Sequence, residues 1–267
     1  MIDWTDAFDN SGYVPGADDL IALWAQEAEV FRASLGARAQ CDLPYGGGAR
    51  ERLDLFLPKG KAQGLVVFIH GGYWHRLDRS YFSQFARGPL AQGWAVAMPS
   101  YPLAPDARIP EITQSVCLAV GHAAGLQPGP IRLFGHSAGG HLAARMACEG
   151  VLPDAVAERL ARVVSVSGIH MLEPLTLAEM NDTLNLTPET ARAESPALLD
   201  PIKTCPFSIW VGANERPELI RQTRLLAEAW SLKDVEIASE YERGRDHFDV
   251  IASLKDPDGA LTREVLR

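Results

Sequence analysis

The sequence predicts an α/β fold in which a mostly parallel central sheet carries helices on both faces. Short apolar runs of strand length, such as Leu65–Ile69 and Phe207–Gly212, alternate with stretches of helical period. This alternation is typical of parallel strands joined by helical crossovers. The runs are continuously apolar, as expected of strands that are covered on both faces. The chain has 267 residues and shows no internal repeat or linker, so we expect residues 1–267 to form a single domain.

The first half of the chain begins with a predicted helix over residues 17–35, where Leu20, Trp24, Ala28, Phe31 and Leu35 form one apolar face. We interpret it as a packing helix, although such a helix could also cover a pocket. The next elements are a strand pair at 41–45 and 52–57 joined by a glycine turn, a strand at 65–69, a helix at 80–92, a strand at 94–98 and a helix at 111–125.

The second half continues the alternation. It contains strands at 131–134, 162–166, 207–212 and 235–241, and helices at 138–148 and 217–230. Residues 168–206 are different, because they mix helical and proline signals without a clear strand. A connection of this length in a compact domain is usually functional. We therefore expect the 168–206 segment to cover the active site.

Composition narrows the class of protein. Hydrophobic residues make up 47% and charged residues 22% of the chain, and the net charge is −9 without a basic patch. This balance is that of a soluble globular protein and argues against nucleic acid or an anionic membrane as a partner. No apolar run reaches membrane-spanning length, and the acidic start Met1–Asn10 does not resemble a signal peptide.

The four cysteines are scattered and form no metal-binding spacing. Free thiols of this kind are typical of a reducing cytoplasm. We expect a cytoplasmic protein that binds a small-molecule substrate and uses no metal or cofactor. The sequence leaves the oligomeric state open, with a homodimer among the options.

The pentapeptide Gly135-His136-Ser137-Ala138-Gly139 lies between a predicted strand and a predicted helix. This is the setting of a nucleophile elbow, a sharp turn that exposes a reactive serine. Glycines at its two ends leave room for close backbone approach, and the helix N-terminus favours negative charge near Ser137. The alternative is an ordinary turn, because Gly and Ser are common turn residues.

A serine hydroxyl needs a base within hydrogen-bond reach and an acid that orients this base. In this architecture the chain order is serine, acid, histidine. His247 is the histidine that follows the last predicted strand, so it is the candidate base. Glu215, in the loop after strand 207–212, is the favoured acid, and Glu218 in the first turn of the next helix is the alternative.

The negatively charged tetrahedral intermediate of acyl transfer needs backbone N–H donors. His70-Gly71-Gly72 follows a strand and matches the glycine motif that supplies such donors in serine hydrolases. Gly71, Gly72, Tyr73 and Ala138 are therefore the candidate oxyanion hole. A plain turn is the alternative interpretation of the two glycines.

Together, His70-Gly71-Gly72-Tyr73-Trp74, Gly135-His136-Ser137-Ala138-Gly139 and the order Ser137, Glu215, His247 resemble the kynurenine formamidase (arylformamidase) branch of the α/β-hydrolases. The HGG-x-W form is the most specific part, because related lipases and esterases usually carry HGGG. The resemblance covers roughly residues 17–255. It implies an α/β-hydrolase fold and hydrolysis of N-formyl-kynurenine to formate and kynurenine.

The chain departs from this family at two places. Glu215 stands where the formamidases carry Asp, and His170-Met171 stands where the family often has an aromatic residue followed by Asp. Trp74 and Tyr73 are candidate substrate-binding residues that would narrow the acyl pocket, whereas the alternative for Trp74 is packing in the core. His136 is a further candidate for substrate binding, with local packing as its alternative.

Two other functions remain open from the sequence. A short-chain carboxylesterase or thioesterase would use the same residues, because one machinery can cleave an aryl formamide and an ester. A ligand-binding receptor on this fold would turn over little substrate, but it would have no need to keep all of the candidate catalytic residues. A metalloenzyme is disfavoured, since no H-E-x-x-H motif or ligand spacing occurs.

Overall fold

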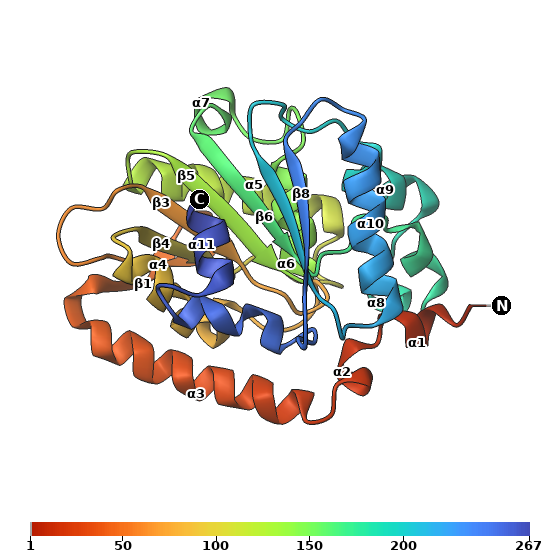
Figure 1. The fold of residues 1–267 in the computed structure, drawn as a ribbon, viewed down its shortest axis with the longest axis horizontal. Coiled ribbons are helices and arrows are strands. Elements are labelled where there is room, and N and C mark those ends of the chain that lie inside the picture. Colours follow the sequence, from red (N-terminus) through yellow and green to blue (C-terminus); the bar gives the residue numbers. More distant parts are fainter. Residues whose placement is uncertain (1) are drawn as a thin grey trace.

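In the computed structural model, which describes residues 2–267, eight strands form one sheet in the order β1-β2-β4-β3-β5-β6-β7-β8 (Figure 1). The pairs β1–β2 and β2–β4 are antiparallel, and all other neighbours are parallel. The strands are β1 (Ala39–Pro44), β2 (Arg52–Phe56), β3 (Leu65–Ile69), β4 (Ala95–Pro99), β5 (Ile131–His136), β6 (Leu160–Val166), β7 (Phe207–Gly212) and β8 (Ile237–Glu242).

The α-helices are α1 (Trp4–Phe8), α2 (Asn10–Tyr13), α3 (Ala17–Leu35), α4 (Arg87–Ala91), α5 (Ile109–Leu126), α6 (Ala138–Met146), α7 (Asp154–Ala157), α8 (Asn181–Leu184), α9 (Pro188–Ala193), α10 (Pro217–Ser231) and α11 (Ala260–Leu266). Short 3₁₀ helices span Gly36–Arg38, Arg79–Tyr81, Ser83–Ala86, Glu173–Leu177, Pro196–Leu198 and Asp249–Lys255. In residues 2–267, no helix has the length and apolar character that crossing a membrane requires.

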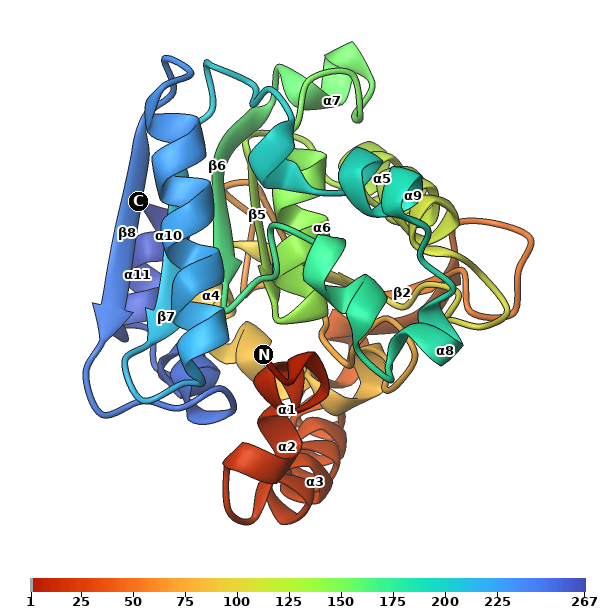
Figure 2. The same ribbon diagram turned by 90° about the vertical axis from the view of Figure 1, so that its right-hand side faces the viewer.

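Two apolar cores lie on opposite faces of the sheet. One contains the buried residues of α5, α6 and α10, and the other contains those of α3, α4 and α11. Figure 1 looks onto the face that carries α11, and Figure 2 shows α5, α6 and α10 on the other side. Strands β3 to β7 lie between the two cores, so both of their faces are buried. This explains why their sequences are continuously apolar.

The predicted fold class is confirmed, and all eight strands form within two residues of their predicted bounds. The helix predicted over residues 80–92 is wrong in part. It is broken into two 3₁₀ helices and the short α4. Residues 83–86 are all buried, between α3 and the 3₁₀ helix Asp249–Lys255. Packing on two sides thus replaces a regular helix there. The helices α1, α2 and α11 were not predicted.

The carboxyl ends of the parallel strands meet at one edge of the sheet, where functional residues of open α/β sheets gather. The loops that leave β3, β5, β6, β7 and β8 all start from this edge. It therefore brings together segments that are far apart in the sequence. The red N-terminal helices α1 and α2 lie near the lower end of α10 in both ribbon views.

Candidate active site

Ser137 occupies the sharp turn between β5 and α6. Its backbone has φ 57° and ψ −121°, a conformation that non-glycine residues rarely adopt. The turn is tight enough that a Cβ on Gly139 would lie 2.0 Å from the carbonyl oxygen of Ile69. Strain of this kind at a serine is the mark of a nucleophile elbow. The turn directs the Ser137 hydroxyl toward the loop that follows β8.

His247 lies in that loop and faces Ser137. Its Nε2 atom is 3.0 Å from Ser137 Oγ, and its Nδ1 atom is 2.7 Å from Glu215 Oε2. The His247 side chain is 4% exposed and that of Glu215 is fully buried. Asp246 does not face the imidazole, because its Oδ1 atom accepts from the N–H groups of Phe248 and Asp249. The structure thus places Ser137, His247 and Glu215 in one hydrogen-bonded chain.

Glu215 is held by two further donors. Its Oε1 atom accepts from the Gly212 N–H at 2.8 Å and from the Ser167 hydroxyl at 2.5 Å. These contacts fix the carboxylate, so that Oε2 faces His247. Sequence reasoning missed Ser167. The signal was its place directly after β6, because β6 and β7 are parallel neighbours whose carboxyl ends adjoin.

Glu218, the alternative acid, points elsewhere. Its carboxylate accepts from Arg221 at 2.7 Å and from the Gln222 amide at 2.7 Å. The Gln222 Oε1 atom in turn accepts from the N–H groups of His170 and Met171. Glu218 therefore secures the start of the 168–206 segment against α10, and Glu215 is the carboxylate beside His247.

The glycine motif after β3 lies directly over the serine. A Cβ on Gly71 would be 3.0 Å from Ser137 Cβ, and one on Gly72, whose φ is +118°, would be 2.2 Å from the Arg76 carbonyl oxygen. Ala138 is the first residue of α6, and the first N–H groups of a helix have no partner within it. The structure thus brings Gly71, Gly72 and Ala138 around Ser137, where their N–H groups can serve an oxyanion.

Trp74 does not line the pocket beside Ser137. Its side chain is fully buried in the core on the α5–α6–α10 face, and its Nε1–H donates to His141 Nδ1 at 3.2 Å. The interpretation as a pocket-narrowing residue is therefore corrected in favour of core packing. Tyr73 lines the pocket with its ring, while its hydroxyl donates to the Phe8 carbonyl and accepts from the Asn10 N–H.

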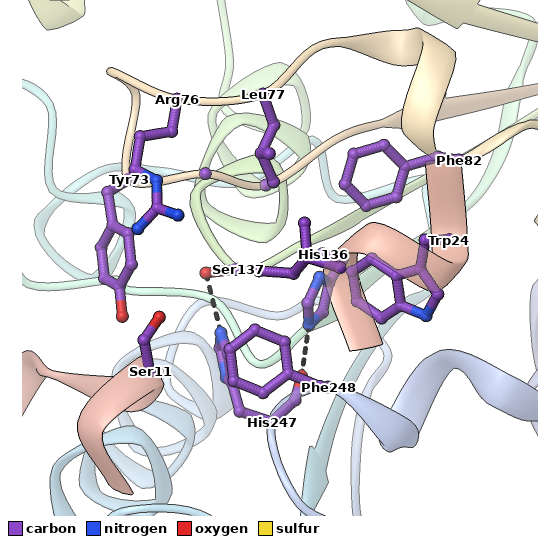
Figure 3. Close-up of a pocket in the computed structure, with 13 residues that line it drawn as sticks. Ser11, Trp24, Tyr73, Arg76, Leu77, Phe82, His136, Ser137, His247 and Phe248 are labelled. Atoms are coloured by element: carbon purple, nitrogen blue, oxygen red, sulfur yellow. Dashed lines mark hydrogen bonds between the residues drawn. The ribbon is translucent and has the colours of Figure 1, made fainter. Parts of the chain in front are cut away.

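The pocket beside Ser137 has a volume of about 30 Å³ (Figure 3). One wall is apolar and contains Ile21, Trp24, Leu77, Phe82 and Phe248, and the other contains Ser11, Tyr73 and Arg76. No residue of 168–206 lines it, so the expectation that this segment covers the site is wrong for this pocket. The N-terminal helices α2 and α3 cover it instead, because they pack against the loops after β3 and β8.

The N-terminal segment is held next to the candidate acid. Arg216, adjacent to Glu215, donates to the Asp9 carbonyl at 2.7 Å and forms two hydrogen bonds to the Asp6 carboxylate, at 2.8 and 2.9 Å. Its guanidinium also lies 4.8 Å from the centre of the Tyr13 ring. Because α1 and α2 carry these partners, their docking is tied to the loop that presents Glu215.

His136 also borders the pocket. Its Nε2 atom is 2.7 Å from the His247 carbonyl oxygen, while its buried Nδ1 atom has no hydrogen-bond partner in residues 2–267. Burial and the neighbouring His247 lower the pKa of His136 to about 3. His136 is therefore neutral at ordinary pH, and its bond to the His247 backbone supports the loop.

Three other histidines are fully buried. Burial lowers the pKa of His70 to about 4, and those of His141 and His170 to about 3. The two ring nitrogens of His141 are 3.2 Å from Trp74 Nε1 and 2.7 Å from the Glu194 carbonyl oxygen. Protonation of His141 would leave Nδ1 unable to accept from Trp74. The buried histidines should therefore make folding sensitive to acid.

We expect the stability cost of His141→Gln to shrink as the pH falls. An unfolded imidazole binds a proton below about pH 6.5, but the buried one does so only near pH 3, so acid favours the unfolded wild-type chain. The variant lacks this proton binding, which lowers the free energy of unfolding of the wild type by up to about 1.4 kcal/mol per pH unit below 6.5. Urea unfolding at pH 7 and pH 5 measures the difference in free energy of unfolding between wild type and variant.

The matched control is His122→Gln, a half-buried histidine on α5. It corrects for the general acid sensitivity of the fold. If the difference in free energy of unfolding between wild type and His141→Gln is the same at both pH values, the expected effect of His141 protonation is contradicted.

Comparison with known proteins shows the family to which the chain belongs. A family model described as BD-FAE matches residues 53–220. The kynurenine formamidase of Danio rerio is 31% identical, with coverage of 94% of this chain and 89% of the relative. The kynurenine formamidase of Salmo salar is also 31% identical, with coverage of 94% and 90%. This chain belongs to the kynurenine formamidase-like α/β-hydrolases. It is a hydrolase.

Solved structures show the same fold. A protein of Silicibacter sp. TM1040, provisionally described as a thioesterase, is 44% identical, has a TM-score of 0.95 and is covered over 100% of both chains. An esterase of Pyrobaculum calidifontis is 18% identical, with a TM-score of 0.71 and coverage of 93% of this chain and 92% of its own. The second likeness concerns the fold alone.

The two departures from the formamidase pattern have different structural settings. Glu215 lies in the candidate site itself. His170 is fully buried, with its Nε2 atom 2.9 Å from the Ser165 hydroxyl and its backbone bound by Gln222. In this formamidase-like chain, His170 thus anchors the 168–206 segment and does not border the pocket beside Ser137.

Proposed function

We propose that the protein hydrolyses an aryl formamide such as N-formyl-kynurenine through Ser137, His247 and Glu215 and a formyl-serine intermediate. The observation that carries this proposal is the hydrogen-bonded chain from Ser137 Oγ through both nitrogens of His247 to Glu215. A buried acid, an oriented imidazole and a serine on a strained turn are the parts of acyl-transfer catalysis. The kynurenine formamidases among its relatives support the choice of substrate.

The first half-reaction forms the acyl-enzyme. His247 Nε2 takes the proton of Ser137 as its Oγ attacks the formyl carbon. The N–H groups of Gly72 and Ala138 hold the oxyanion, and Glu215 stabilises the imidazolium through Nδ1. The C–N bond then breaks, and His247 returns the proton to the nitrogen of the departing arylamine.

The second half-reaction releases the acid. A water molecule gives a proton to His247 and attacks the formyl carbon of the Ser137 ester. The intermediate collapses with the proton returned to Ser137 Oγ, and formate leaves. Neither step changes an oxidation state, because both are acyl transfers to oxygen.

The size of the pocket supports a short acyl group. Its volume of about 30 Å³ is two to three times the roughly 10–15 Å³ that one water molecule needs in a cavity. A formyl group fits such a space, whereas a long acyl chain does not. The leaving group then lies toward the mouth, between the apolar wall and Arg76.

A short-chain esterase or thioesterase is the second candidate. It is favoured by the Silicibacter structure, which is 44% identical over the whole chain and carries a provisional thioesterase description. The same residues would serve this reaction, since an ester or thioester passes through the same tetrahedral intermediate. The substrate therefore has to be decided by measurement.

For each substrate we divide kcat/KM by the rate constant of the uncatalysed reaction. We expect this quotient to be at least about a hundredfold larger for N-formyl-kynurenine than for p-nitrophenyl acetate. The reason is that a formamidase stabilises the transition state of an amide, which reacts slowly without an enzyme. Both activities are followed spectrophotometrically with the same enzyme preparation. A p-nitrophenyl ester series from acetate to octanoate tests the short acyl pocket in parallel.

The opposite result would identify the second candidate. If the acetate ester is cleaved well and N-formyl-kynurenine is not, the protein is an esterase with a formamidase-like motif. Efficient cleavage of the octanoate ester would contradict the short acyl pocket.

A further inference from the structure

Arg76 stands at the mouth of the pocket beside Ser137. Among the described residues that line this pocket, it is the one arginine or lysine. Its side chain is 43% exposed, so it marks the side open to solvent. Figure 3 shows its guanidinium directed into the space between Tyr73 and Ser137, with the Ser11 hydroxyl on the same side.

The guanidinium has little else to bind. Its one ion pair among residues 2–267 is with Asp18, at 4.0 Å, and the Asp18 side chain is 87% exposed. Exposed pairs of this kind contribute little. Arg216 is different, because its guanidinium makes hydrogen bonds of 2.7–2.9 Å to Asp6 and Asp9. The donors of Arg76 are therefore free for a ligand.

The position of Arg76 is fixed by the same turn that forms the candidate oxyanion hole. The Arg76 N–H donates to the Gly72 carbonyl at 2.8 Å, and the Arg76 carbonyl oxygen lies close above Gly72. A substrate whose carbonyl oxygen is bound by the Gly72 N–H therefore lies beside Arg76, which lines the same pocket. The apolar wall with Leu77 and Phe82 suits an aromatic ring on the way.

We propose that Arg76 is a specificity-determining residue that binds a carboxylate on the leaving group. The preferred substrates are then aryl formamides or esters whose leaving group carries a carboxylate. This inference rests on the proposed acyl-transfer function of Ser137. Arginine has five N–H donors in a planar fork that matches a carboxylate. Arg76 brings a positive charge to the mouth of the pocket, which favours a ligand that carries a negative group.

The test compares substrates that differ only in charge. N-formyl-kynurenine is paired with its α-carboxamide, and 4-acetoxybenzoate is paired with 4-acetoxybenzamide. For each pair we measure the ratio of kcat/KM, carboxylate over carboxamide, in wild type, Arg76→Gln and Arg76→Lys. The matched control is Arg224→Gln, an exposed arginine on α10 outside the pocket.

We expect the wild type to prefer the carboxylate member, and Arg76→Gln to lower the ratio by about 10- to 100-fold, the range for hydrogen bonds to a charged group. The loss should appear mainly in KM, because the contact is made in the ground state and the transition state alike. Arg76→Lys should restore part of the ratio through its point charge, and Arg224→Gln should keep the wild-type ratio.

Several results would overturn the inference. These are a wild type without preference for the carboxylate, an unchanged ratio in Arg76→Gln, or an equal loss on both members of a pair, which would show a role only in shaping the turn. Calorimetric binding of kynurenine and of kynurenine carboxamide gives the same comparison without turnover.

The outcome for the proposed function is separate. If N-formyl-kynurenine is not cleaved but the ester pair shows a preference that Arg76→Gln removes, the formamidase proposal fails and the inference on Arg76 stands. If N-formyl-kynurenine is cleaved as fast as its carboxamide, the inference fails and the formamidase proposal stands.

Discussion

Replacing Ser137 with alanine is expected to lower kcat/KM by about five to six orders of magnitude on whichever acyl substrate the enzyme prefers. In the proposed mechanism the Ser137 hydroxyl is the attacking group, so without it His247 has no proton to take. The N–H donors of Gly72 and Ala138 remain, and they leave a residual rate above that in water. Steady-state kinetics with N-formyl-kynurenine and p-nitrophenyl acetate measure the loss.

A control serine and a covalent probe accompany this variant. Ser231→Ala, at the exposed end of α10, should keep wild-type activity. A serine-reactive phosphonate should label the wild type at Ser137 and should leave Ser137→Ala unlabelled. A ligand-binding receptor with little turnover would label slowly or not at all, and activity that survives in Ser137→Ala would show that the nucleophile lies elsewhere.

The second large effect concerns the acid. Glu215→Gln should lower kcat by about four orders of magnitude, as expected when an amide replaces the carboxylate of a catalytic triad. An amide can hold His247 in the wrong tautomer and cannot stabilise the imidazolium. Glu215 also accepts from Ser167 and the Gly212 N–H. A Gln at this position would turn its carbonyl oxygen toward these two donors and its NH₂ group toward His247. Stopped-flow or steady-state kinetics give kcat.

Two further variants test whether the effect belongs to this carboxylate. Glu215→Asp keeps the charge and introduces the residue that kynurenine formamidases are expected to carry at this position. It should therefore retain more activity than Glu215→Gln. Glu218→Gln keeps the hydrogen-bonding shape of a side chain that faces Arg221 and Gln222, and it should stay within a few-fold of wild type. If Glu218→Gln loses as much activity as Glu215→Gln, the assignment of Glu215 as the acid is wrong.

Much of the prediction of the candidate site rested on local sequence motifs. The strand, the glycines and the following helix around Ser137 are contiguous, so the sequence was enough to predict the turn. The choice of His247 followed from the chain order of serine, acid and histidine. Glu215 was favoured over Glu218 because Pro217 starts the next helix and leaves Glu215 in the loop before it. The structure brings these three residues together at hydrogen-bond distance.

Other features depended on contacts between distant segments. Trp74 sits next to the glycines in the sequence, yet its side chain turns into the core and binds His141. The residues 168–206 pack along α10, while Ser11 and Trp24 from the N-terminal helices line the pocket. Neither outcome follows from a local pattern, because a side chain's direction and a segment's docking site depend on what surrounds them.

The α/β fold, the elbow at Ser137 and the order of serine, acid and histidine could be predicted from the residues alone, because each depends on local spacing or on the direction of parallel strands. Three features needed the folded chain: which carboxylate faces His247, the contact of Ser167 with it, and the pocket wall formed by the N-terminal helices with Arg76 at its mouth. These depend on side-chain packing between segments that lie far apart in the sequence, as Arg216 and Asp6 do at a separation of 210 residues.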